Sequence, residues 1–127
     1  MASIPTLADP APQPAPSSGP RYVALSVIAP CYNEEANVRA LTERVLAMFD
    51  ERSIVGELVL VNDASTDQTG PVLDELARQH QRLVVVHHET NRGIEGGWRS
   101  GLKASQGSDV CLMDADMQNL PEDVWRL

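Results

Sequence analysis

Four short apolar runs, separated by segments with helical spacing, constrain the fold of this chain more than any other feature. They cover residues 22–29, 57–62, 83–87 and 109–113. The runs are apolar almost throughout instead of alternating with polar residues, which is typical of parallel strands that are covered on both faces. Strand and helix signals that alternate in this way predict an α/β fold with a doubly wound, open and mostly parallel sheet.

The segments between the runs carry the spacing of amphipathic helices. In the first segment, apolar residues recur every three or four positions, at Val38, Leu41, Val45 and Met48. We expect Pro30 to end the first strand and Asn33 to cap this helix. A second helix is predicted around residues 72–77, and a third one after a glycine-rich bend over residues 91–97.

The first 20 residues differ in composition from the rest of the chain. Residues 1–20 contain six of the nine prolines, mixed with alanine, serine and glutamine. A segment of this kind has too few large apolar side chains to offset the entropy cost of ordering its backbone. We therefore expect a disordered, proline-rich tail, followed by one folded domain over residues 21–127.

The acidic composition disfavours one class of function. The formal net charge is −8, from 10 basic and 18 acidic residues. Nucleic-acid binding is not expected, because it requires a basic surface that displaces counterions from phosphates. No run approaches the roughly 18 apolar residues of a spanning helix, and no basic residue precedes Arg21, as a signal peptide would require. These features predict a cytoplasmic chain.

Polar side chains follow each of the four apolar runs. They are Asn33 and Glu34 after the first, Asp63 after the second, Asn91 and Arg92 after the third, and Asp114 and Asp116 after the fourth. In an open α/β sheet, ligands bind beyond the carboxyl ends of the strands. We therefore expect these residues to lie around a single site.

The segment after the fourth run has the pattern of a metal site. On an extended backbone, Asp114, Asp116 and Gln118 point to the same side. Their oxygen atoms suit a hard divalent cation such as Mg²⁺ or Mn²⁺, although a solvated acidic turn has the same sequence pattern. A divalent cation would also allow an acidic pocket to hold a diphosphate. The sequence has neither the P-loop pattern nor G-x-G-x-x-G as an alternative phosphate site.

Four segments, in order, carry a resemblance to a known family. They are SVIAPCYNEEANV, LVLVNDASTDQT, ETNRGIEGGWRSGLKAS and CLMDADMQNLPED. Together they resemble the nucleotide-binding half of family 2 glycosyltransferases, over about residues 22–127. The run DADMQNLPED further resembles the branch that transfers sugars to polyprenyl phosphates, as dolichol-phosphate mannosyltransferase-like enzymes do. The resemblance implies a GT-A-like, Rossmann-like fold.

The resemblance implies roles for individual residues in holding a nucleotide. The residues that match the family's first-strand loop, which holds the nucleotide, are Pro30, Tyr32 and Glu34. Asp63 matches an acid that contacts the base or the ribose. The family often has two acids at this point, and Asn62 replaces the first of them here.

The resemblance also assigns the acidic segment near the end of the chain. Asp114 and Asp116 match the Asp-x-Asp motif that engages the sugar nucleotide and its metal. Gln118 matches a further metal ligand of the polyprenyl-phosphate branch. Arg99 corresponds to a position near the diphosphate, but the sequence around it departs from the commoner form in the family.

The resemblance implies a metal-dependent glycosyltransferase that binds a nucleoside diphosphate sugar and transfers the sugar to an acceptor such as a polyprenyl phosphate. Family members continue for about another hundred residues, and their catalytic base lies there, so we expect the base beyond Leu127. This chain is then a fragment, a truncated frame or half of a split enzyme. Association with a membrane would come through the missing part or through the lipid acceptor. The alternative function is a non-catalytic domain that binds a nucleotide sugar or a partner protein.

Two further predictions concern residues outside these motifs. Adjacent strand residues point to opposite faces, so one of His87 and His88 is expected inside and the other in solvent. Ser65, Thr66 and Ser108 have no histidine and aspartate at a suggestive spacing. We therefore do not expect a nucleophilic hydrolase.

Overall fold

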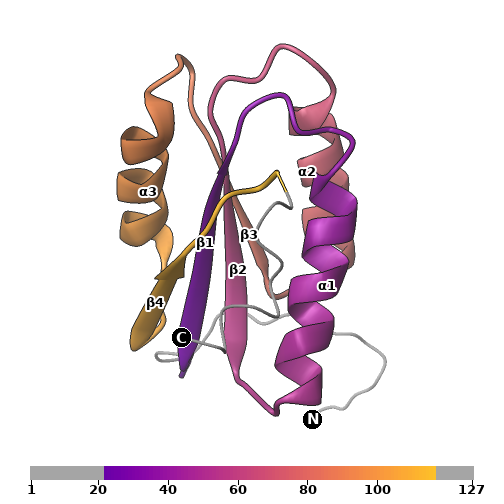
Figure 1. The fold of residues 1–127 in the computed structure, drawn as a ribbon, viewed down its shortest axis with the longest axis vertical. Coiled ribbons are helices and arrows are strands. Elements are labelled where there is room, and N and C mark those ends of the chain that lie inside the picture. Colours follow the sequence, from indigo (N-terminus) through magenta and orange to yellow (C-terminus); the bar gives the residue numbers. More distant parts are fainter. Residues whose placement is uncertain (1–21, 117–127) are drawn as a thin grey trace, which may run out of the picture.

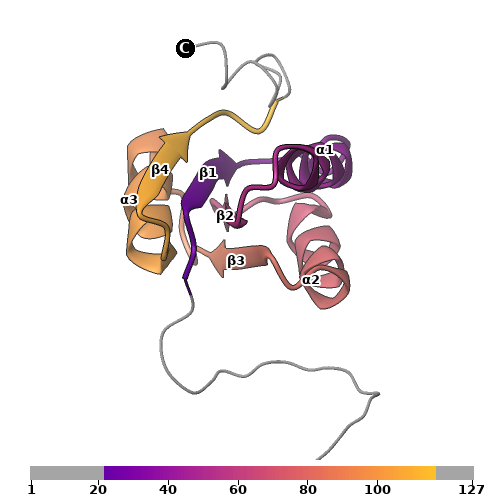
Figure 2. The ribbon, with the colours of Figure 1, turned by 90° about the horizontal axis from the view of Figure 1, so that it is seen from below.

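The computed structural model describes residues 22–116, which form a parallel sheet with helices on both faces. The elements in chain order are β1 (Leu25–Cys31), α1 (Val38–Glu51), β2 (Gly56–Asn62), α2 (Thr69–Gln79), β3 (Leu83–His87), α3 (Gly93–Ala104) and β4 (Asp109–Leu112). The strand order is β3-β2-β1-β4, and every strand pair is parallel. Figures 1 and 2 show α1 and α2 on one face of the sheet and α3 on the other. The predicted open, doubly wound sheet is confirmed.

The core has two layers because the sheet is covered on both faces. All seven residues of β2 are buried, which explains why this run is apolar almost throughout. The larger cluster lies under α1 and α2, and the predicted helix face (Val38, Leu41, Val45 and Met48) is buried in it. The smaller cluster lies under α3 and contains Ile28, Val59 and Val61, with Trp98 packed against it.

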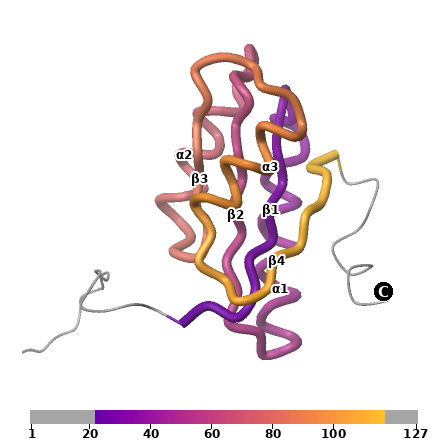
Figure 3. Tube along the Cα trace, turned by 90° about the vertical axis from the view of Figure 1, so that its left-hand side faces the viewer, coloured from indigo at the N-terminus to yellow at the C-terminus, as the bar shows by residue number. Residues whose placement is uncertain are grey.

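Helix α3 lies close to the sheet because glycines face the strands. Gly97 and Gly101 are buried one helical turn apart, and Figure 3 shows α3 running over β1 and β2. A Cβ atom on Gly97 would lie 2.6 Å from Cβ of Pro30, and one on Gly101 would overlap Cγ2 of Ile28. The absence of a side chain at these two positions therefore sets the distance between helix and sheet.

Strand β1 does not end before Pro30, as the sequence predicted, but continues to Cys31. The carbonyl of Ile28 accepts a hydrogen bond from Met113 beside β4, while the carbonyl of Cys31 accepts one from Asp63 beside β2. Pro30 is two residues from Ile28, so its nitrogen points to the β4 side, where the pairing with β4 has already ended at Ile28. The missing N–H therefore costs the sheet no hydrogen bond.

The start of the first helix also differs from the prediction. Helix α1 begins at Val38, preceded by a turn in which Glu34 accepts the N–H groups of Asn37 and Val38. Asn33 is not its cap. It has a positive φ of 53°, and its side chain binds the loop after β2 instead. The predicted tail over residues 1–20 and the predicted ligand Gln118 lie outside the described residues. None of the helices between residues 22 and 116 is long and apolar enough to cross a membrane.

Candidate functional site

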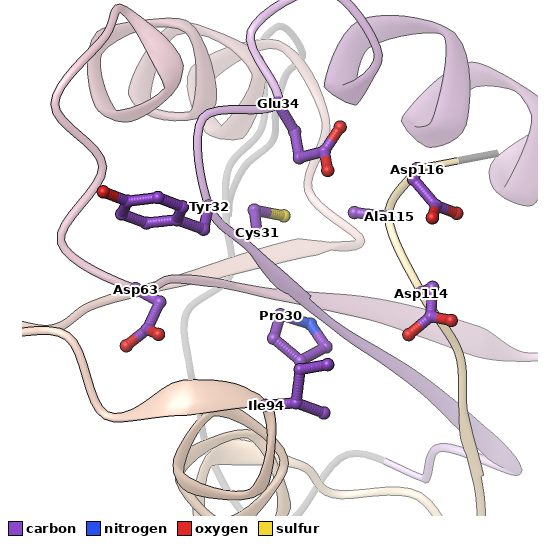
Figure 4. Close-up of a pocket in the computed structure, with 9 residues that line it drawn as sticks. All are labelled: Pro30, Cys31, Tyr32, Glu34, Asp63, Ile94, Asp114, Ala115 and Asp116. Atoms are coloured by element: carbon purple, nitrogen blue, oxygen red, sulfur yellow. The ribbon is translucent and has the colours of Figure 1, made fainter.

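A pocket of about 230 Å³ opens at the carboxyl ends of β1, β2 and β4 (Figure 4). Its lining residues are Pro30, Cys31, Tyr32, Glu34, Asp63, Ile94, Asp114, Ala115 and Asp116. The structure therefore brings six of the predicted site residues together, from three separate strand ends. Their roles stay predictions. Cys31, Ile94 and Ala115 were not foreseen as lining residues, because no polar group marks them in the sequence.

The loops after β1 and β2 are joined by hydrogen bonds that hold the upper wall of the pocket. The side-chain oxygen of Asn33 accepts the N–H of Thr66 at 2.8 Å and that of Asp67 at 3.3 Å. The N–H of Glu34 donates to Oγ1 of Thr69 at 2.9 Å. These bonds fix the backbone of Tyr32 and Glu34 relative to the sheet. Tyr32 remains 48% exposed at the pocket.

Asp63 is a buried carboxylate that caps α3. Its Oδ1 accepts the N–H of Arg92 at 2.7 Å, and its Oδ2 accepts the N–H of Gly93 at 2.9 Å. A carboxylate at a helix N-terminus satisfies free backbone N–H groups and is stabilised by the helix dipole. Burial tends to raise the pKa of Asp63, but the hydrogen bonds from His88, Arg92 and Gly93 outweigh it, and the net shift is downward. Asp63 is therefore ionised at neutral pH.

Two adjacent histidines, at the end of β3, have different environments, as predicted. The side chain of His88 is only 3% exposed, and its Nδ1 lies 2.8 Å from Oδ1 of Asp63. Its Nε2 lies 2.6 Å from Oγ of Ser100 on α3. His87 is 41% exposed and pairs with Asp74 at 2.8 Å. Neither the contact between His88 and Asp63 nor that between His88 and Ser100 is marked by a motif in the sequence.

Asn62, which the resemblance matches to the first of two acids, has a local structural role here. Asn62 does not line the pocket. Its Oδ1 accepts the N–H of Ser65 at 3.1 Å, and its Nδ2 lies 3.0 Å from Nδ1 of His87. An amide supplies both an acceptor and a donor for these two partners, whereas an ionised carboxylate supplies acceptors alone.

The acid pair lies across the pocket from Asp63. In Figure 4, Asp114 and Asp116 lie on one side, Asp63 and Tyr32 on the other, and Glu34 above. Among the described residues, every charged side chain that lines the pocket is a carboxylate. No group of three or more His, Cys, Asp or Glu residues within residues 22–116 is placed to hold a metal ion. Asp114 and Asp116 thus supply carboxylate oxygens but are not a complete ligand set.

The pocket has no ready nucleophile in Cys31. This thiol is fully buried, and burial, with a smaller contribution from the charge of Glu34, raises its pKa to about 12. A thiol with such a pKa stays protonated at neutral pH and is a poor nucleophile. Cys31 therefore serves as an apolar part of the pocket wall.

The chain belongs to glycosyltransferase family 2. The family model described as glycosyl transferase family 2 matches residues 26–127. An undecaprenyl-phosphate 4-deoxy-4-formamido-L-arabinose transferase from Aeromonas hydrophila is 38% identical over 104 residues, which are 81% of this chain and 32% of that protein. The dolichol-phosphate mannosyltransferase of Saccharomyces cerevisiae is 34% identical over 83% of this chain and 40% of its own length. The resemblance to the polyprenyl-phosphate branch is thus confirmed, and the chain spans about a third of the length of the curated relatives it matches.

Solved structures of other proteins have a similar fold. A mannosyltransferase from Pyrobaculum calidifontis, in complex with GDP-Man and Mn²⁺, matches with a TM-score of 0.66 and 28% identity, over 76% of this chain and 28% of its own. TarS from S. aureus, in complex with UDP-GlcNAc, matches with a TM-score of 0.62 and 33% identity, over 74% of this chain and 27% of its own. The sheet and helices described above are therefore the GT-A-like fold that the sequence predicted.

Proposed function

We propose that this chain binds the donor of a glycosyltransferase reaction, a nucleoside diphosphate sugar, together with Mg²⁺ or Mn²⁺. The observation that supports this most strongly is the charge of the pocket. Glu34, Asp63, Asp114 and Asp116 are acidic, and no basic side chain within the described residues lines the pocket. A diphosphate can enter such a site when a divalent cation neutralises the facing carboxylates.

The two sides of the pocket suit the two parts of such a donor. The half-exposed ring of Tyr32 offers an apolar face to a base, and the ionised Asp63 offers an acceptor to N–H or O–H groups of a base or ribose. Asp114 and Asp116, on the other side, would face the diphosphate. Pro30 lines the pocket between them.

The residues present fit a divalent cation as part of its ligand set. Asp114 and Asp116 are both partly exposed and supply the carboxylate oxygens that Mg²⁺ and Mn²⁺ prefer. Mg²⁺ keeps several waters and binds proteins through one or two carboxylates plus substrate phosphates, so two aspartates suffice as the protein's share. Gln118 is a further candidate ligand. When bound, the cation stabilises the charge of a departing diphosphate.

The acceptor that we propose is a polyprenyl phosphate. The names of the A. hydrophila and S. cerevisiae relatives include undecaprenyl phosphate and dolichol phosphate, respectively. A lipid acceptor would bring the enzyme to a membrane surface during the reaction. No residue between 22 and 116 is assigned as the catalytic base, so transfer itself is proposed for the family's complete catalytic domain.

The test is calorimetric titration of the chain with UDP and GDP, each with Mn²⁺ and with EDTA. We expect one nucleotide to bind with Mn²⁺ and to lose most of its affinity with EDTA. Asp116→Asn should weaken Mn²⁺-dependent binding at least tenfold, because it removes a carboxylate charge at the cation. The matched control is Glu43→Gln, an exposed acid on α1 away from the pocket, which should bind as the wild type does.

Two results would count against the proposal. Nucleotide binding that is insensitive to EDTA and to Asp116→Asn would show that no divalent cation takes part in it. Absence of nucleotide binding by a chain with a native circular dichroism spectrum would show that the pocket is not a nucleotide site. A transfer assay with a radiolabelled donor and a polyprenyl phosphate then tests the alternative function, since formation of product by this chain would exclude a non-catalytic binding domain.

A further inference from the structure

A hydrogen-bonded row of three side chains, two of them buried, lies behind the Asp63 side of the pocket. His88 stands between Asp63 and Ser100, with Nδ1 2.8 Å from Oδ1 of Asp63 and Nε2 2.6 Å from Oγ of Ser100. The side chains of His88 and Asp63 are 3% and 5% exposed. The three residues come from the end of β2, the end of β3 and the middle of α3, so this hydrogen-bonded row connects three elements at the pocket.

The hydrogen bond between His88 and Asp63 has a fixed direction. An ionised carboxylate only accepts hydrogen bonds, so Nδ1 of His88 carries a proton and donates a hydrogen bond to Asp63. The Nε2 atom then accepts from the Ser100 hydroxyl when the imidazole is neutral, and donates to it when the imidazole is protonated. Because a hydroxyl can take either part, the bond to Asp63 persists in both states.

The bond from His88 also determines which carboxylate oxygen remains for a ligand. Oδ1 of Asp63 accepts from both His88 and the N–H of Arg92, whereas Oδ2 accepts from the N–H of Gly93. A carboxylate oxygen has two lone-pair positions, so Oδ1 is saturated by these groups and Oδ2 keeps one free position. Asp63 lines the pocket, while His88 and Ser100 do not.

The serine, histidine and aspartate have the order of a hydrolase triad, but their placement does not allow that chemistry. A triad serine must reach the substrate, and Ser100 does not line the pocket. His88 is also enclosed by its two partners and the surrounding protein. The hydrogen-bonded row therefore acts on the pocket through Asp63 and not through Ser100.

We propose that His88, supported by Ser100, is a positioning residue for donor binding: it holds the Asp63 carboxylate so that Oδ2 is presented to the nucleotide. The same hydrogen bond from His88 keeps the carboxylate in place to accept hydrogen bonds from the N–H groups of Arg92 and Gly93, at the start of α3. This inference rests on the proposed function, because it takes the nucleotide as the ligand of Asp63. It adds a residue outside the pocket to the determinants of affinity.

The test uses substitutions that keep one imidazole nitrogen at a time. In His88→Asn, the amide nitrogen takes the place of Nδ1 and can still donate to Asp63. In His88→Gln, it takes the place of Nε2 and reaches Ser100 but not Asp63. His88→Leu keeps neither bond. We expect His88→Asn to bind the nucleotide within about threefold of the wild type, and both His88→Gln and His88→Leu to lose roughly tenfold.

A second readout follows the carboxylate without any ligand. In ¹H–¹⁵N spectra of the full chain, the amide protons of Arg92 and Gly93 report their hydrogen bonds to Asp63. Their resonances should stay near the wild-type positions in His88→Asn and move upfield in His88→Gln and His88→Leu. Thermal unfolding of each variant shows whether affinity follows the retained atom or only global stability.

The outcomes separate this inference from the proposed function. Loss of affinity that is equal in His88→Asn and His88→Gln, or that tracks the melting temperature alone, overturns the positioning role. If the wild type binds no nucleotide, the proposed function fails, and with it the statement about the nucleotide. If the Arg92 and Gly93 resonances do not move in His88→Gln and His88→Leu, His88 does not position the Asp63 carboxylate, whether or not a nucleotide binds.

Discussion

Replacing Gly101 by alanine is expected to destabilise this protein, although alanine is the better helix former. Gly101 lies inside α3 and is buried against the sheet. A Cβ atom built on it overlaps Cγ2 of Ile28 and lies 3.4 Å from Cγ2 of Val61. Both residues are fully buried, and a β-branched side chain has little freedom to turn away. The added methyl group must therefore push α3 away from β1.

The magnitude follows from two opposing effects. Forcing an additional methyl group into a packed core costs about 1–3 kcal/mol. Replacing glycine by alanine inside a helix contributes about 1 kcal/mol in the opposite direction. The expected net loss in the free energy of unfolding is therefore about 1 kcal/mol, with an upper end of about 2 kcal/mol. At a urea m value of about 2 kcal/mol/M, the unfolding midpoint falls by roughly 0.5–1 M.

The assay is urea unfolding followed by circular dichroism, with Lys103→Ala as the control on the exposed side of α3. The control should change the midpoint little. A double-mutant cycle with Ile28→Leu, which removes the Cγ2 branch, tests the contact directly, and there Gly101→Ala should cost at most half as much. A Gly101→Ala chain as stable as the wild type would refute the close packing of α3 on β1.

Two further predictions concern the loop after β2. Ala64 has a φ of 60°, so Ala64→Gly should raise the free energy of unfolding by about 0.5–1 kcal/mol in urea unfolding, since relief of left-handed strain exceeds the added chain entropy; Ala77→Gly in α2 should instead lower it. Asp63→Asn should cost about 1–2 kcal/mol at pH 5. In the folded protein the pKa of Asp63 lies below its ordinary value of 3.8. The contribution of Asp63 to the stability of the fold is therefore present above pH 3.8 and is lost as the pH falls through the folded pKa. If the unfolding curves of the wild type and of Asp63→Asn differ equally at pH 5 and at pH 3, the stabilisation does not come from the ionised carboxylate of Asp63.

The fold was predictable because its main signals are local and repeat along the chain. The apolar run of β2 and the helical spacing of α1 follow from what each element buries, and both are found where the sequence indicated. Pro30 and Asn33 misled the local rules for a non-local reason. Pro30 is tolerated because β4 is too short to pair beside it, and Asn33 binds a loop more than 30 residues away.

The acidic residues of the pocket were predictable for a topological reason. Parallel strands place their carboxyl ends at one edge, so any acid directly after a strand must lie there. Glu34, Asp63 and Asp114 follow the ends of β1, β2 and β4 within three residues, and the structure brings them together. This convergence follows from the parallel direction of the strands alone. Strand direction does not indicate which helix residues face the strand ends.

The contact between His88 and Ser100 depends on the rotation and closeness of α3, which strand order does not determine. Gly97, Ser100, Gly101 and Ala104 recur at three- and four-residue spacing and therefore share the helix face that lies on the sheet. The two glycines allow that face to approach β1, and the same approach brings Ser100 within 2.6 Å of His88. At its N-terminus the helix is held by Asp63. Packing of α3 and orientation of the Asp63 carboxylate are thus coupled, so Gly97→Ala, which presses on Pro30, should disturb the pocket as well as the core.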